Sequence, residues 1–375
     1  MQLPYSEELN IGYLSRLFDN TTNCYKFFWF QAILRKVDDA HCRFTFDELI
    51  NEMIADAWYM VTECHLRLGP LGITDNLEEV VKYIYEKYGF PSSEKREKIL
   101  EFLQTTDDRK IVRYKSDLTL NVPYRLQVPF YDEINIEKNM WNGSKQILTR
   151  EINRQKRLMY SLISGLGTVI EVDSLWAEYL CRHKEILKAW TQLKLIQYLQ
   201  NKNPSVPGIA DKLEAPESRN IERVRKYWKL IIEIEPSLKD IYGEVTLGEE
   251  NISVDHFVPW QYVAHDELWN LHPTTKSINS SKSNSLPSWT LYFRPLGELE
   301  YEAYELKSRN ETVAQEFQKI APYHLNNQEI RNRLYADGLD RQTFIERLEH
   351  VVKPVYESAQ MAGFKEWVYD GGKSI

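Results

Sequence analysis

Over most of its length the chain repeats apolar residues every three or four positions, which is the pattern of amphipathic helices. The first strong case begins at Thr45-Phe-Asp-Glu48, whose threonine and glutamate fit a capping box. The apolar period continues to Val61, so we predict a helix over residues 46–61. Further helices are predicted over residues 77–88, 93–103, 174–200, 218–235, 298–319, 327–335 and 341–360.

The helical pattern is interrupted in residues 110–131 and again after residue 250. Residues 110–131 carry two prolines among short apolar stretches, which favours an extended or weakly stranded segment. The run Ile252 to Val258 is β-branched and aromatic, so it predicts a strand that Pro259 ends.

A second short strand is predicted over residues 268–272, ended by Pro273. The polar stretch 274–285 then predicts a helix capped by Thr274 or Thr275. Strand, loop, strand and helix therefore follow one another within about forty residues.

The length of 375 residues favours two or three folded units rather than one. Charged residues make up 27% of the chain and no segment has a biased composition, which fits a globular protein rather than a disordered one. No apolar run approaches the roughly 20 residues of a membrane span, and the first ten residues are acidic. We therefore expect no membrane association and a cytoplasmic location.

Four widely spaced cysteines without a Cys-x-x-Cys pair argue against a zinc ribbon or a disulfide framework. The formal net charge of -8 argues against binding of nucleic acid through a generally positive surface. Two basic stretches, 138–157 and 223–229, could still contact a phosphate backbone locally. An ordinary solvated helix face explains both more simply.

The chemistry of the chain is concentrated where the predicted strand 252–258 carries Asp255 and His256 side by side. The predicted helix after it offers Asn279, flanked at three-residue spacing by Lys276 and Lys282 on neighbouring positions of one face. Carboxylate and amide oxygens are hard ligands that suit Mg²⁺ or Mn²⁺. A neutral imidazole beside them can take a proton from an attacking water. Metal-assisted phosphodiester cleavage needs these groups together.

The segment Val254 to Ser288 resembles the HNH nuclease domain of the ββα-metal superfamily, in the variant found in RNA-guided CRISPR nucleases. The resemblance covers about a tenth of the chain. It is carried by the spacing of the Asp-His pair, the middle asparagine, the helical asparagine, the lysine after it and the closing Leu-Pro-Ser, that is, by Asp255, His256, Asn270, Asn279, Lys282 and Leu286 to Ser288.

This resemblance implies that Asp255 and Asn279 are metal ligands and that His256 is the general base. It further implies that Asn270 holds the loop by hydrogen bonds that orient His256, and that Lys282 assists phosphate binding. No separate organic cofactor is implied.

The sequence departs from the family pattern at two positions. Asn279 stands where many HNH proteins have histidine, and Ser277 stands where some have a further acid. Both departures favour one hard cation, Mg²⁺ or alternatively Mn²⁺, over zinc.

The expected fold class is α+β and predominantly α-helical, with a small ββα-metal (HNH) unit inserted between two helical regions. We place a mainly helical N-terminal region at 1–245, the HNH nuclease domain at 246–295 and a helical C-terminal region at 296–375. The helical regions would supply targeting, regulation or oligomerisation.

The resemblance implies a metal-dependent HNH endonuclease that acts on DNA. A nuclease for RNA or structured junctions, and a noncatalytic binding module, are the alternatives. Stand-alone HNH proteins resemble restriction or anti-phage defence effectors of bacteria, which suggests a defence-system partner protein. One site cuts one strand, so a double-strand break would need a homo-oligomer or two binding events.

Four aromatic or imidazole side chains near the motif have simpler explanations. Trp260 and Trp269 are expected to pack over the small two-stranded unit. His265 and His272 are expected to be loop or surface histidines, with His272 the better functional candidate because it follows the second predicted strand.

Overall fold

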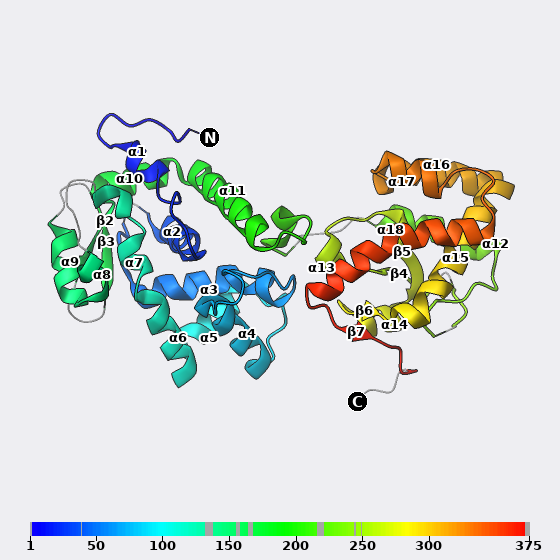
Figure 1. The fold of residues 1–375 in the computed structure, drawn as a ribbon, viewed down its shortest axis with the longest axis horizontal. Coiled ribbons are helices and arrows are strands. Elements are labelled where there is room, and N and C mark those ends of the chain that lie inside the picture. The colour runs from blue at the N-terminus through cyan, green and yellow to red at the C-terminus, as the bar shows by residue number, and fades with distance from the viewer. Residues whose placement is uncertain are drawn as a thin grey trace. The chain divides into compact units, whose positions relative to one another are not determined.

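The computed structural model divides the chain into two compact units, Met1–Pro204 and Ser205–Ile375, which are drawn in Figure 1. The structure describes residues 2–38, 40–131, 138–154, 158–163, 168–215, 221–243, 245–248 and 250–371. Among these residues, no helix combines the length and the apolar character needed to cross a bilayer. Helices dominate both units, with a few short strands between them.

The first unit packs its helices around α2 and α3, which contact each other directly and are both rich in buried apolar side chains. Its helices are α1 (Ile11–Ser15), α2 (Tyr25–Lys36), α3 (Phe46–Thr62), α4 (Asn76–Tyr88), α5 (Arg96–Thr105), α6 (Arg109–Thr119), α7 (Val122–Arg125), α8 (Lys138–Asn142), α9 (Lys145–Asn153), α10 (Ser174–Arg182) and α11 (Lys184–Lys202). A short 3₁₀ turn lies at Val128–Tyr131 in this unit, and another lies at Ile209–Lys212 in the second unit.

Two of the predicted helices of this unit end and begin where local capping residues indicate. Thr45 accepts from the backbone of Glu48 while the Glu48 side chain accepts from the backbone of Thr45, so the capping box of α3 is confirmed. Asp75 caps α4, and Gly89 ends it in the left-handed conformation that glycine adopts without strain. Helix α5 begins at Arg96, three residues later than predicted.

The extended segment predicted over residues 110–131 is wrong. Asp108 caps a helix, α6, through the backbone N–H of Lys110, and α7 follows almost at once. Pro123 lies in the first turn of α7, where the missing N–H of proline leaves no hydrogen bond unmade. The single helix predicted over residues 174–200 is divided at His183 into α10 and α11.

A small sheet in the first unit joins β1 (Arg43–Thr45), β3 (Val169–Val172) and β2 (Tyr160–Ile163) in that order, all antiparallel. The basic stretch 138–157 forms α8 and α9, and residues 155–157 lie outside the described part of the chain. The structure pairs none of the four cysteines in a disulfide, and those at 24 and 64 are buried.

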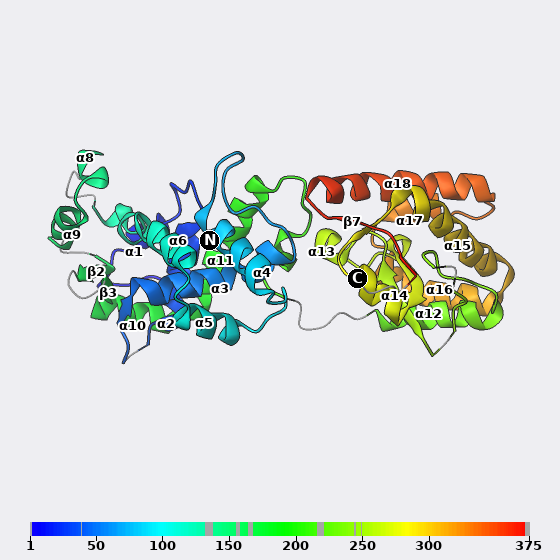
Figure 2. The same cartoon turned by 90° about the horizontal axis from the view of Figure 1, so that it is seen from below.

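The second unit surrounds a two-stranded antiparallel sheet, β4 (Ile252–His256) with β5 (Leu271–Thr275). Its helices are α12 (Glu222–Ile234), α13 (Trp260–Val263), α14 (Lys276–Lys282), α15 (Trp289–Arg309), α16 (Glu311–His324), α17 (Gln328–Leu334) and α18 (Arg341–Met361), together with the 3₁₀ turn η3 (Leu268–Asn270) and the parallel pair β6 (Leu286–Pro287) with β7 (Glu366–Trp367). Helices α12 and α14 pack on β4 and β5. Figure 2 shows α18 along one side of this unit and α12 with α16 along the other.

Pro273 and Pro295 lie inside elements of this unit, although we predicted that the neighbouring elements end or begin there. Residues 268–270 form a turn, and the second strand runs through Pro273, which pairs with Val254. Both strands of a two-stranded sheet are edge strands, so a proline can face outward without breaking the ladder. Pro295 lies within α15, which begins at Trp289 because Tyr292, Phe293 and Leu296 bury their side chains in the unit.

Candidate active site

The β4–β5 pair and the helix after it bring the predicted residues into one small volume. Asp255 lies opposite His272, and His256 lies opposite Leu271, in the antiparallel register. Thr275 ends β5 and caps α14 by accepting from the backbone N–H of Ile278, as predicted. The strand end and the helix therefore approach each other as a strand, strand, helix unit.

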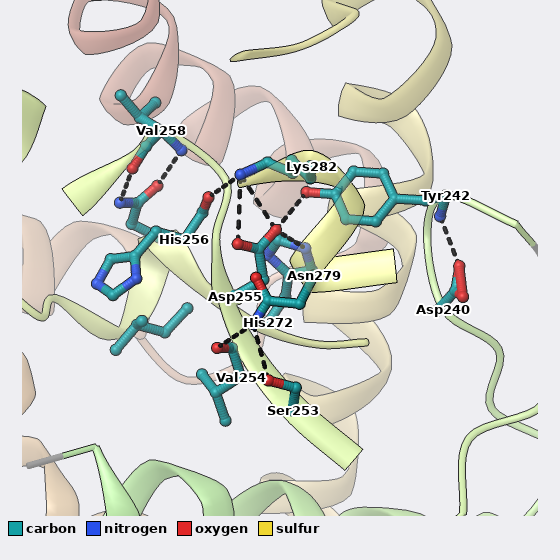
Figure 3. Close-up of polar contacts among 12 residues, drawn as sticks. Asp240, Tyr242, Ser253, Val254, Asp255, His256, Val258, His272, Asn279 and Lys282 are labelled. Carbon is teal, nitrogen blue, oxygen red and sulfur yellow. Dashed lines mark hydrogen bonds and ion pairs between the residues drawn. The ribbon is translucent and has the colours of Figure 1, made fainter. Parts of the chain in front are cut away.

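The carboxylate of Asp255 is buried and held from two directions. Tyr242 donates its hydroxyl to Oδ2 at 2.8 Å, and Lys282 Nζ lies 3.2 Å from Oδ1 and 3.2 Å from Oδ2. Figure 3 shows both side chains directed at this carboxylate. Burial raises the pKa of Tyr242 well above its ordinary value, and the carboxylate beside it acts in the same direction, so the hydroxyl keeps its proton.

Lys282 is completely buried, whereas Lys276 on the same helix is exposed. Lys282 is therefore turned into the unit, and its predicted place on one helix face with Lys276 is wrong. Besides Asp255, Lys282 Nζ donates to the backbone oxygen of His256 at 2.8 Å. Burial lowers the pKa of this ammonium, and the Asp255 carboxylate opposes that shift.

His256 follows Asp255 on the strand, so its ring is directed to the opposite face, and Figure 3 shows the ring pointing away from the carboxylate. His256 Nε2 lies 2.8 Å from Oδ1 of Asp266. Because a carboxylate accepts, this contact places the N–H on Nε2 and leaves Nδ1 with the lone pair. Sequence reasoning did not single out Asp266, since ten residues and a helix separate it from His256 in the chain.

Asn270 is completely buried and uses both ends of its amide on one residue. Its Oδ1 accepts from Val258 N at 2.8 Å, and its Nδ2 donates to Val258 O at 2.8 Å. The backbone oxygen of Asn270 also accepts from Phe257 N at 2.9 Å. Asn270 therefore fixes the chain that leaves His256, and its side chain does not bond the imidazole itself.

Asn279 joins the helix to the strand through its amide nitrogen. Nδ2 donates to Ser253 Oγ at 2.7 Å and to Val254 O at 3.3 Å. Within the part of the chain that the structure describes, Asn279 Oδ1 accepts no hydrogen bond. This oxygen is thus available as a ligand.

Asp255, His256, Asn279 and Lys282 all line one cavity of about 400 Å³. The other lining residues are Ile221, Arg225, Ser253, Val254, Pro259, Trp260, Gln261, Ser283 and Asn284. Arg225 extends from α12, and its Nε is buried without a hydrogen-bond partner among the described residues. The lining thus carries two cationic side chains and one carboxylate, a balance that favours an anionic ligand.

The donor set at this cavity fits one hard divalent cation. Asp255 and Asn279 offer two oxygen ligands, and Mg²⁺ commonly takes one or two protein oxygens together with water and substrate phosphate. Over the described residues, no group of three or more His, Cys, Asp or Glu side chains could hold a metal by itself. A closed structural zinc site, which uses four nitrogen or sulfur ligands, therefore has no counterpart in that part of the chain.

His272 and His265, which we expected to be loop or surface histidines, both have surroundings that lower the pKa of the imidazole. His272 is completely buried between the rings of Tyr242 and Phe257, and its Nε2 lies 3.7 Å from Asp255 Oδ2. Burial lowers the pKa of His272 to about 4 despite the opposing effect of Asp255, so the imidazole is neutral and the contact is no ion pair near neutral pH. Burial lowers the pKa of His265 as well. Trp260 and Trp269 are buried, as predicted.

Strands β4 and β5 and helix α14 form a strand, strand, helix unit, and one comparison with known proteins matches this segment. Residues 240–288 match the family model described as HNH endonuclease. The match supports an HNH nuclease domain in this segment and includes the five predicted site residues. It also includes Tyr242, which we had placed in the N-terminal region 1–245. Searches of the curated proteins and of the solved structures found no match.

Proposed function

We propose that the chain is a metal-dependent endonuclease that hydrolyses phosphodiester bonds, with DNA as its substrate. The observation that carries this proposal is that Asp255, His256 and Asn279 line a single cavity on a strand, strand, helix unit that matches the HNH endonuclease family. Arg225 and Lys282 add positive charge to the same cavity. A phosphodiester is an anion of the right class for such a lining.

Asp255 and Asn279 are the residues that would hold Mg²⁺, or alternatively Mn²⁺. When bound, such an ion stabilises the negative charge that develops on the phosphate and on the leaving oxygen. Lys282 and Tyr242 fix the orientation of the Asp255 carboxylate by their hydrogen bonds from within the unit. Asn279 is fixed in the same way by Ser253.

His256 acts as the general base in this proposal. Its Nδ1 carries the lone pair and forms no hydrogen bond with a described residue, so it can take a proton from water that attacks phosphorus. Asn270 supports it by fixing the backbone at Val258. Lys282, which touches the backbone oxygen of His256 and lines the cavity, remains a proposed aid to phosphate binding.

The direct test is nicking of supercoiled plasmid by the full chain with Mg²⁺, with Mn²⁺ and with EDTA. His256→Ala should lower the single-turnover rate by roughly 10² to 10⁴, whereas His350→Ala, on the exposed surface of α18, is the matched control. Asp255→Ala and Asn279→Ala should raise the Mg²⁺ concentration for half-maximal rate. An unchanged rate for His256→Ala would end the proposal.

The same centre could cleave any phosphodiester backbone presented to it, so the substrate is tested with plasmid, single-stranded DNA and RNA in parallel. Faster cleavage of RNA would replace DNA as the assigned substrate. Binding of all three without Mg²⁺-dependent cleavage would indicate a noncatalytic binding module.

We place the protein in the cytoplasm of a bacterial cell, as a restriction or anti-phage defence effector that cuts as a homo-oligomer or with a partner protein. The resemblance to stand-alone HNH proteins supports this setting. Plaque counts on cells that express the wild-type chain or His256→Ala test the defence role, and equal counts would contradict it.

A further inference from the structure

The loop between α13 and η3 carries the carboxylate that contacts His256. Asp266 lies in this loop, and its Oδ1 is 2.8 Å from His256 Nε2. The side chains of His256 and Asp266 are 8% and 23% exposed, so water competes little for this hydrogen bond. The pair is therefore a fixed contact rather than a transient surface pair.

The same loop is held from the other side by the end of α16. His324, the last residue of α16, lies with Nδ1 2.7 Å from the backbone oxygen of Asp266. Asn326 donates its backbone N–H to the two carboxylate oxygens of Glu267 at 3.0 and 3.2 Å, and its Nδ2 to one of them at 2.8 Å. Two consecutive loop residues are thus anchored by residues almost 60 positions later in the chain.

Two of the three residues in these contacts, His324 and Glu267, are buried, whereas Asn326 is exposed. His324 is 4% exposed and Glu267 is 7% exposed. A buried carboxylate that accepts three hydrogen bonds from one residue cannot move without leaving its charge unpaired. The position of Glu267, and with it the position of its neighbour Asp266, is therefore set by Asn326, together with His324 at the end of α16.

We propose that Asp266 is a positioning residue for His256, and that His324 at the end of α16, with Asn326 two residues after it, holds Asp266 in place. The inference rests on the proposed role of His256 as general base. Asp266 keeps the proton of the neutral imidazole on Nε2, so that Nδ1 remains the basic nitrogen, and it fixes the ring angle. Residues after the matched segment 240–288 then help to position the general base of the catalytic centre.

A spectroscopic test does not depend on cleavage. In the full chain labelled with ¹⁵N-histidine, the two ring nitrogens of His256 are assigned by comparison with His256→Ala, and their shifts report which nitrogen is protonated. The wild-type ring should be the Nε2–H form, and Asp266→Ala should convert it to a mixture of both forms. A mixture in the wild type, or no change in Asp266→Ala, would overturn the inference.

A kinetic test uses single-turnover cleavage with Mg²⁺. Asp266→Ala should lower the rate roughly 10- to 100-fold with little change in the substrate concentration for half-maximal rate. Asp266→Asn keeps an acceptor oxygen in place and should recover most of the rate. In the His256→Ala background, Asp266→Ala should cause no further loss. A further loss there would show that Asp266 acts independently of His256.

The anchor is tested by Asn326→Ala, which removes one side-chain hydrogen bond to Glu267 and leaves the backbone N–H. Asn332→Ala, on the exposed face of α17, is the matched control. Asn326→Ala should give a smaller rate loss and a partial tautomer mixture at an unchanged far-UV spectrum. A wild-type tautomer in Asn326→Ala would restrict the positioning role to Asp266 and overturn the anchoring role of Asn326.

The two proposals fail in different ways. Absence of Mg²⁺-dependent cleavage by the wild-type chain would contradict the nuclease assignment, while the tautomer measurement would still decide the role of Asp266. Normal wild-type cleavage with an unaffected Asp266→Ala would reject the positioning role and leave the nuclease assignment standing.

Discussion

Lys282 Nζ lies 3.2 Å from each carboxylate oxygen of Asp255, and both side chains are buried. Among the described residues, the Lys282 ammonium is the cationic group in contact with this carboxylate. His272 also lies near it, but its imidazole is neutral near neutral pH. A buried ion pair contributes little net stability, because both groups lose water on folding. Removing one of the two charged side chains lowers stability strongly, since the remaining charge stays buried without its partner.

Lys282→Met should therefore lower the stability of the Ser205–Ile375 unit by about 3–5 kcal/mol in the absence of metal. If Asp255 is a metal ligand, Mg²⁺ should restore part of this loss, because the ion neutralises the same carboxylate. Scanning calorimetry of the full chain with EDTA and with Mg²⁺ measures both effects. Lys276→Met, on the exposed side of α14, is the control, and an equal response of both variants to Mg²⁺ would contradict the metal site.

Asn270→Ala should leave the backbone N–H and C=O of Val258 without their partners. Each unsatisfied buried group costs about 1–3 kcal/mol, so the unit should be clearly destabilised. Turnover should fall because the chain after His256 is no longer fixed, while the Mg²⁺ dependence should stay as in the wild type. Urea unfolding and Mg²⁺ titration of the cleavage rate check the two parts.

Asn270→Asp sharpens this prediction. The carboxylate still accepts from Val258 N but cannot donate to Val258 O, so it faces that carbonyl with a repulsive charge. It should therefore be at least as destabilising as the alanine variant. Equal losses of turnover and of metal affinity in either variant would show that Asn270 is structural for the whole site.

The sequence predicts elements well where the stabilising contacts are local. Thr45 with Glu48, and Asp75 with Gly89, mark the ends of α3 and α4 through bonds that span a few residues. Strands β1, β2 and β3 were missed because each is only three or four residues long. Strand β1 also pairs at a great distance along the chain, as Arg43 with Glu171 does. Residues 110–131 were misassigned because prolines that start a turn were taken as strand signals.

The site residues also divide into those placed by local contacts and those placed by contacts far apart in the sequence. Asp255, His256 and Asn279 could be found because a local spacing of strand, strand and helix determines where they meet. Asp266 and His324 could not be found from the sequence, since they come together only when α16 packs against the loop between α13 and η3. The burial of Lys282 was missed because a lysine in a polar helix predicts an exposed face. The three-region division of the chain and the individual catalytic roles remain predictions.

His272 should make the free energy of unfolding of its unit decrease as the pH is lowered. Its folded pKa is lowered from 6.5 to about 4, so below about 6.5 the unfolded chain binds a proton that the folded chain does not. Stability should decrease as the pH falls from about 6.5 to about 4, by on the order of 3 kcal/mol. Melting temperatures across this range measure the effect.

His272→Leu removes the titrating ring and keeps an apolar side chain of similar size in the pocket between Tyr242 and Phe257. The acid-dependent loss should become smaller by the same amount. His350→Leu controls for the loss of an imidazole at an exposed site. An acid profile that is the same in His272→Leu and the wild type would show that other groups cause the loss.

Glu300 should have the opposite effect, because it is a buried acid on α15. It is 4% exposed, and its Oε1 has no hydrogen-bond partner among the described residues. Burial raises its pKa well above the ordinary 4.5, so the folded chain keeps a proton that the unfolded chain releases. Stability is therefore fully present below about pH 4.5 and is lost as the pH rises toward the folded pKa, by up to about 1.4 kcal/mol per pH unit.

Glu300→Gln keeps the shape of the protonated acid and removes its titration. The variant should lose less stability than the wild type between pH 5 and pH 8, as measured by urea unfolding at several pH values. Glu305→Gln, a more exposed acid of the same helix, controls for the removal of a negative charge from α15. If Glu300→Gln and the wild type lost stability in parallel over this range, the Glu300 carboxyl would already be ionised in the folded chain. Burial would then not raise its pKa, and this prediction would be wrong.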